Sequence, residues 1–190
     1  MSSPQATEPK GADRGEWARR RTLCAVLLNP ALKPLDDTIT YRNVCSILPL
    51  VGCDRIAVAN LINVPTKDAA ALNRATIRDS EVEEAQAALA ITLERADEVI
   101  IAWGVGGMSG PVRLSLQRQA RWLFDVLNQV GIERVWTVTA KPRHPSRWRQ
   151  YVGPEKGRVP GDCFEERLSQ ILVPTLLDTQ EGRVLFDYAF

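Results

Sequence analysis

Residues 22–28 read TLCAVLL, a run that is apolar on both of its potential faces and stops at Asn29-Pro30. A strand with one wet face alternates apolar and polar side chains, whereas a strand covered on both faces is apolar throughout. A short apolar run bounded by turn residues is typical of a central parallel strand. The run therefore predicts a sheet with helices packed on both of its faces.

Similar runs follow along the chain and alternate with helical patterns. The predicted strands are Thr22–Leu28, Arg55–Ile62, Glu98–Trp103 and Arg134–Thr139. The predicted helices are Thr38–Val51, Asp79–Arg95 and Val112–Val130. Asp37 is the expected N-cap of the first helix, and Asp79 or Ser80 that of the second. Gly52 is expected to end the first helix and Gly131 the third.

Alternation of strands and helices predicts an α/β fold with a mainly parallel, four-stranded sheet. Right-handed crossovers place the helices on both faces, which gives a three-layer α/β/α domain. We expect this domain to span residues 21–152, after a disordered lead-in over residues 1–20. Residues 153–190 are expected to form a C-terminal extension that packs on the domain, with a helix over Cys163–Leu172.

The overall composition limits the kinds of partner and cofactor that we expect for this protein. The 24 basic and 23 acidic residues give a net charge of +1, which is not the charge of a protein held to nucleic acid by bulk electrostatics. One histidine and four cysteines without a CxxC pair predict no metal and no cofactor. No apolar run reaches the ~18 residues of a membrane span and no secretory signal is visible, so we expect a cytoplasmic protein with free thiols.

Polar loops follow each of the four predicted strands. In open parallel sheets, ligands bind outside the carboxyl ends of the strands, so these loops share one rim. The loops contain Asn29-Pro30, Asn60–Asn63, Gly104–Gly107 and His144-Pro145-Ser146. The glycine loop is expected to let backbone N–H groups approach a phosphate.

Three side chains on this rim can carry chemistry. Asn29 offers an amide directly after a buried strand, or is simply turn chemistry with Pro30. Asn60 either satisfies backbone groups or reads a planar ligand such as a nucleobase edge. His144 is either an acid, base or cation in a site or an exposed loop histidine. Ser146 beside it would cap a turn or bind a phosphate.

A basic segment with an aromatic side chain surrounds this histidine. Arg143, Arg147, Trp148 and Arg149 suit phosphate contacts combined with stacking or wedging into nucleic acid. The alternative is a solvated basic loop with a half-buried tryptophan.

Four motifs, in this order, resemble a known family. LNPA at residues 28–31, ANLIN at 59–63, VIIAWG at 99–104 and PRHPS at 142–146 look like the domain of unknown function 1643. Asp36-Asp37 matches the acidic pair of that family. The resemblance covers about residues 20–150.

At one remove, the layout resembles the uracil-DNA glycosylase superfamily. That resemblance implies a water-positioning role for Asn29, base reading by Asn60, and stabilisation of the departing base anion by His144. It also departs from the superfamily pattern. Asn29 stands where many members have aspartate, Tyr41 is a distant candidate for the stacking aromatic residue, and Trp148 stands near the usual wedge leucine.

The resemblance implies a nucleobase-recognising protein without cofactor. One possibility is a DNA glycosylase-like hydrolase that cleaves the N-glycosidic bond of a uracil-like or modified base. The alternative is a non-catalytic protein that binds a nucleotide or modified base in order to sequester or sense it. The partner would be a nucleobase or nucleotide, or DNA, and the sequence does not fix the oligomeric state. The expected catalytic residues are Asn29 and His144. The expected base- or nucleotide-binding residues are Asn60, Pro30, Asp37, Gly104 and Ser146. The expected nucleic-acid backbone or wedge residues are Arg143, Arg147, Trp148 and Arg149.

Overall fold

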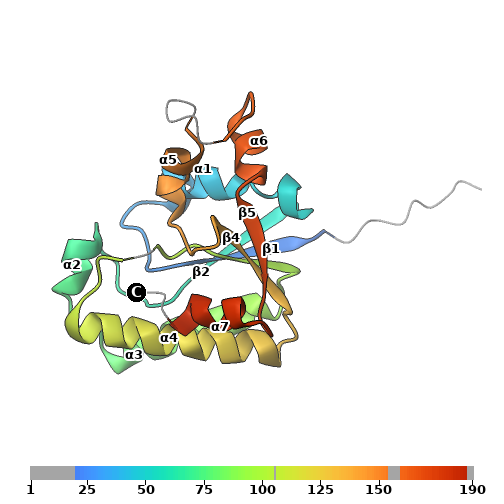
Figure 1. Ribbon diagram of the computed structural model, residues 1–190. Coiled ribbons are helices and arrows are strands. Elements are labelled where there is room, and N and C mark those ends of the chain that lie inside the picture. Colours follow the sequence, from blue (N-terminus) through green and yellow to red (C-terminus); the bar gives the residue numbers. More distant parts are fainter. Residues whose placement is uncertain (1–19, 105, 154–158, 188–190) are drawn as a thin grey trace, which may run out of the picture.

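The computed structural model describes residues 20–104, 106–153 and 159–187, and it contains a five-stranded sheet in the order β2-β1-β3-β4-β5 (Figure 1). The strands are β1 Thr22–Leu27, β2 Arg55–Asn60, β3 Glu98–Ile101, β4 Arg134–Val138 and β5 Leu172–Leu176. The first four are parallel, and β5 runs antiparallel to β4. The four predicted strands all form, and the four-stranded prediction was one strand short.

Seven helices are present in the described parts of the chain, together with three short 3-10 helices. The α-helices are α1 Ile39–Cys45, α2 Ala69–Asn73, α3 Asp79–Leu93, α4 Gly110–Gln129, α5 Trp148–Val152, α6 Phe164–Ser169 and α7 Gln180–Asp187. The 3-10 helices span Leu35–Asp37, Pro49–Val51 and Pro145–Arg147. None of the helices in this part of the chain is long and apolar enough to cross a membrane.

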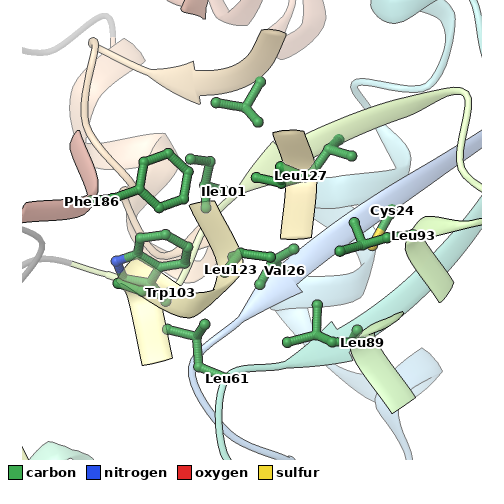
Figure 2. Close-up of a cluster of buried hydrophobic side chains, with 14 of the residues drawn as sticks. Cys24, Val26, Leu61, Leu89, Leu93, Ile101, Trp103, Leu123, Leu127 and Phe186 are labelled. Atoms are coloured by element: carbon green, nitrogen blue, oxygen red, sulfur yellow. The ribbon is translucent and has the colours of Figure 1, made fainter. Parts of the chain in front are cut away.

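The sheet is covered on both faces, as the apolar run at residues 22–28 indicated. Cys24 and Val26 of β1 belong to the hydrophobic cluster that includes side chains of α3, α4 and α7 (Figure 2). The alternate β1 residues Leu23, Ala25 and Leu27 belong to the cluster that includes side chains of α1, α5 and α6. Figure 1 shows these two helical layers on opposite sides of the sheet. The three-layer prediction is confirmed.

The first predicted helix is wrong in extent and in its cap. Helix α1 ends at Cys45, and the chain then turns into the 3-10 helix that begins at Pro49, which has no N–H to continue an α-helix. The N-cap is Thr38, whose Oγ1 accepts from Tyr41 N at 3.1 Å, and not Asp37. Gly52 follows the segment with φ +67°, as expected for a left-handed cap.

The cap of the second predicted helix also differs. Helix α3 has Arg78 as its N-cap residue, and the backbone N–H of Arg78 donates to the Glu81 carboxylate at 2.8 Å. The predicted caps Asp79 and Ser80 are therefore already inside the helix. A carboxylate three residues into a helix satisfies a backbone N–H that the helix itself cannot.

The residues after 158 contribute to the sheet and to the core. The expected helix at Cys163–Leu172 is shorter, since α6 ends at Ser169 and Leu172 begins strand β5. In α7, Phe186 is buried against Trp103 and Phe124, with ring centroids 5.8 Å and 5.3 Å apart (Figure 2). Edge-to-face aromatic pairs of this kind stabilise a core beyond the area they bury.

A buried ion pair network ties the amino ends of the strands together. Glu98, only 5% exposed, accepts from Arg21 at 2.8 Å, from Arg134 at 2.7 Å and from Trp136 Nε1 at 2.8 Å. All donors of the network are paired with one carboxylate at the end of the sheet opposite the strand-end loops. This cluster therefore serves stability, and the polar loops at the carboxyl ends of the strands remain for a site.

Candidate functional site

A cavity of about 1050 Å³ lies at the carboxyl ends of the strands, among the loops that follow β1, β2, β3 and β4. Asn29, Asn60 and His144, which are far apart in the sequence, all line it. Pro30, Gly104, Ser146, Arg143 and Arg147 line it as well. The parallel topology thus brings most of the sequence-predicted site residues to one cavity.

Asn29 ties two of the loops together. Its Nδ2 donates to Val64 O at 3.1 Å, to Thr66 Oγ1 at 3.1 Å and to Pro30 O at 3.3 Å. Backbone carbonyls only accept, so these contacts fix which end of the amide is the nitrogen. The side-chain oxygen points the other way and accepts no hydrogen bond within the described residues, which leaves it open to a ligand or a water.

Asn60 presents a buried acceptor without a partner. The register pairs Asn60 with Leu27, so its side chain lies level with the end of β1. Its Oδ1 is buried and forms no hydrogen bond with any described residue, although the side chain lines the cavity. An unsatisfied buried polar group costs about 1–3 kcal/mol, and a ligand N–H in the cavity would recover that cost.

His144 is held as a neutral imidazole. Its Nδ1 accepts from Ser146 N at 3.3 Å and lies 2.9 Å from Ser146 Oγ. Because a backbone N–H can only donate, Nδ1 is the acceptor and the neutral ring carries its proton on Nε2. Burial lowers the pKa of His144 below its ordinary value of 6.5, and the charge of Arg147 lowers it further. At neutral pH the ring therefore offers an N–H donor and no charge.

The loop that carries His144 leaves β4 through an unusual turn. Thr139 and Ala140 have positive φ angles of 60° and 53°, which residues other than glycine rarely adopt. The turn brings Lys141 and Pro142 back beside Val138 in isolated bridges. Such conformations persist only where the surrounding structure holds them, and they occur preferentially at functional sites.

Two contacts from other elements fix this loop. The buried Asn43 of α1 donates Nδ2 to Pro145 O at 2.8 Å. The Gly104 N–H, after β3, donates to Pro142 O at 2.6 Å. Gly104 has φ +96°, and a Cβ added there would lie 3.4 Å from His144 Cβ. Sequence reasoning missed Asn43, and the signal was an amide next to Val44 and at helical spacing from Ile47, on the side of the helix that these apolar residues mark as buried.

The cavity lining is positively charged. It includes four cations, Lys33, Lys67, Arg143 and Arg147. None of them forms a salt bridge within the residues that the structure describes. The lining includes one carboxylate, that of Asp68, and its Oδ1 caps α2 by accepting from Ala71 N at 2.7 Å. Sequence reasoning missed both lysines, although each follows a predicted strand within a few residues.

Arg143 is the most constrained of these cations. Its guanidinium lies 4.6 Å from the centroid of the Tyr151 ring, and its Nε donates to Thr139 Oγ1 at 3.4 Å. Its carbonyl accepts from Trp148 Nε1 at 2.7 Å. Arg143 is therefore a fixed part of the cavity wall.

Several sequence-predicted residues lie elsewhere. Trp148 is fully buried in the core, so the wedge role predicted for it is wrong. Arg149 lies with its guanidinium 4.4 Å from the centroid of the Phe164 ring, and Asp37 is exposed in a 3-10 helix; neither lines the cavity. Tyr41 does not line it either. No group of three or more potential metal ligands occurs among residues 20–104, 106–153 and 159–187.

Comparison with known proteins gives one match. The model of a family described as "Protein of unknown function (DUF1643)" matches residues 14–146. No curated protein and no solved structure matches the chain. The matched stretch spans β1 to β4 and ends at Ser146, so it includes the loops from which Asn29, Asn60 and His144 reach the cavity.

Proposed function

This chain belongs to the DUF1643 family, and we propose that its cavity recognises a nucleobase and cleaves the N-glycosidic bond that joins the base to its sugar. One observation carries the proposal. Asn60, whose buried Oδ1 has no hydrogen-bond partner among the described residues, and His144, whose proton is on Nε2, line the same cavity. An acceptor and a neutral donor together complement a planar base that presents both N–H and carbonyl groups.

In the proposed reaction, Asn60 accepts from an N–H of the base and so holds it in the cavity. As the bond between the sugar carbon and the base nitrogen breaks, the electron pair leaves with the base and the sugar becomes positively charged. The Nε2–H of His144 hydrogen-bonds the carbonyl oxygen on which the negative charge develops. A preorganised donor of this kind contributes about 10²–10³-fold to kcat in other enzymes.

The attacking water would be oriented by the free Oδ1 of Asn29. Its oxygen bonds to the sugar carbon and keeps one hydrogen as the new sugar hydroxyl, and its other proton passes to the departing base. An amide orients a water but does not remove its proton. The sugar cation is electrophilic enough to react with a neutral water, so the mechanism needs no strong base at this position.

Binding without hydrolysis is a second candidate, and one observation favours it. The amide of Asn29 is committed to Val64 and Thr66, and the carboxylate of Asp68 caps a helix. A cavity that lacks a free carboxylate suits a protein that sequesters or senses a nucleotide or modified base.

Chromatographic detection of released base separates the two candidates. The wild type, His144→Ala and the control Lys141→Met would be incubated with uracil- or modified-pyrimidine-containing DNA and with free nucleotides. Lys141 is exposed and does not line the cavity. Hydrolysis predicts base release that falls about 10²–10³-fold in His144→Ala and is unchanged in Lys141→Met. Thermal stabilisation by a ligand that is recovered intact supports binding without hydrolysis. If the protein neither releases a base nor is stabilised by any ligand, the proposal is refuted.

A further inference from the structure

The two lysines that line the cavity, Lys33 and Lys67, are exposed, and no hydrogen bond or ion pair with a described residue occupies either side chain. Lys33 lies in the loop after β1 and Lys67 in the loop after β2, and Asn29 joins these loops through its bonds to Val64 and Thr66. Arg143 is fixed against Tyr151, and Arg147 lies close enough to His144 to lower its pKa. Neither lysine forms an ion pair with any residue that the structure describes. Two uncommitted ammonium groups on linked loops at a cavity indicate an anionic ligand.

The size of the cavity agrees with a ligand larger than a base. Small-molecule sites have volumes of about 300–1000 Å³, and this cavity, at about 1050 Å³, lies slightly above that range. If the base occupies the part between Asn60 and His144, space remains for a sugar and a phosphate. A phosphate is the anion that a base-bearing ligand carries most often.

We propose that Lys33 and Lys67 form a phosphate seat and that the ligand of this cavity is a nucleotide, recognised by its phosphate as well as by its base. This inference rests on the proposed function for the base and adds the group that the lysines bind. The phosphate belongs either to a free mononucleotide or to a nucleic acid strand. Leu32, which is 64% exposed beside Lys33 on the cavity lining, offers an apolar surface that a neighbouring base of a strand would cover.

Calorimetric titration of the wild type and of the double variant Lys33→Met/Lys67→Met tests the seat. The probes are the four common ribonucleosides, their 5′-monophosphates and inorganic pyrophosphate. Lys141→Met is the matched control, because it removes one exposed lysine charge outside the cavity. The preferred monophosphate should bind the wild type about tenfold or more tightly than its nucleoside, and this advantage should disappear in the double variant and with added salt. Lys141→Met should behave as the wild type.

The outcomes separate this inference from the function on which it rests. Equal affinity of the wild type for nucleoside and monophosphate overturns the seat and leaves base recognition intact. Lysine-dependent binding of pyrophosphate, with no gain from any base, supports the seat and overturns base recognition. Absence of binding by every probe overturns both.

A second titration with a short single-stranded oligonucleotide identifies the source of the phosphate. If a strand is the ligand, it binds more tightly than the mononucleotide and Leu32→Ala weakens only the strand. If a free nucleotide is the ligand, the strand has no advantage and Leu32→Ala changes neither affinity. Both results support the seat, provided that the affinity depends on Lys33 and Lys67.

Discussion

Replacement of Asn43 by alanine should destabilise the fold and release the His144 loop at the same time. Asn43 is 2% exposed, and its Nδ2 donates to Pro145 O at 2.8 Å. Removing the donor breaks one buried hydrogen bond, while the Pro145 carbonyl keeps the backbone N–H of Trp148 as a donor, so the expected cost is about 0.5–1.5 kcal/mol. Each kcal/mol lowers the Tm of a domain of this size by about 2–4 °C, so the expected decrease is about 1–6 °C.

Two measurements check this prediction. Thermal unfolding followed by circular dichroism gives the change in Tm. The imidazole resonances in an NMR spectrum report the loop directly, because the chain has one histidine. The matched control is Asn128→Ala, which removes an amide-to-carbonyl bond of 2.7 Å to Phe124 O on the exposed side of α4 and should change stability by no more than about 0.5 kcal/mol. If Asn43→Ala keeps the wild-type Tm and imidazole signals, Asn43 does not position the loop.

Three further predictions concern the site and the C-terminal helix. The imidazole of His144 should titrate below 6.5. Because its pKa in the folded protein lies below its pKa in the unfolded chain, the free energy of unfolding should fall as the pH drops from 6.5 towards the folded pKa. Urea titrations at several pH values measure this dependence, and His144→Gln should remove it. Gly104→Ala, at φ +96°, should cost about 1–2 kcal/mol and shift the His144 resonances, whereas Gly106→Ala, also at positive φ but with no atom near its Cβ, should leave those resonances unchanged. Gly182→Ala should lower the Tm, since the added Cβ would collide with the Leu176 carbonyl; an unchanged Tm would show that α7 adds nothing to stability.

The parallel strands were predictable because burial on both faces leaves a mark in the sequence. The runs that predicted β1 and β3 are apolar after their first residue, and those that predicted β2 and β4 are interrupted by Asn60 and Thr137. Such mostly apolar runs are typical of strands in parallel sheets. Strand β5 is also mostly apolar, but Pro174 in its middle argues against a strand, and proline is tolerated there because β5 is an edge strand with partly exposed side chains. Its pairing with β4 is a long-range contact that local pattern reasoning does not detect. Helix α7 was missed because it is short, with Leu185 and Phe186 as its buried apolar side chains.

The site was predictable where the backbone topology alone determines it. Asn60 ends β2, and Asn29 and Gly104 lie shortly after β1 and β3, so the sheet itself brings them to one rim. His144 lies further along the loop after β4, and its position also depends on how that loop folds. The role of Trp148 depends on how the segment after Pro145 folds. That segment forms a 3-10 helix and then α5, which turn the indole into the core. A sequence of alternating arginines and a tryptophan does not reveal which of them faces solvent.

The identity of residue 29 follows from its contacts and bears on the mechanism. Its Nδ2 donates to the Val64 carbonyl and to Thr66 Oγ1. An aspartate would place a negative oxygen against that carbonyl, lose two donated hydrogen bonds and separate the loops that carry Lys33 and Lys67. Asparagine thus fits these contacts where aspartate would not, and in the proposed reaction the group that binds the water is an amide oxygen. Because an amide does not deprotonate the water, most of the rate enhancement in the proposed reaction comes from stabilising the departing base, which is the role proposed for the neutral His144.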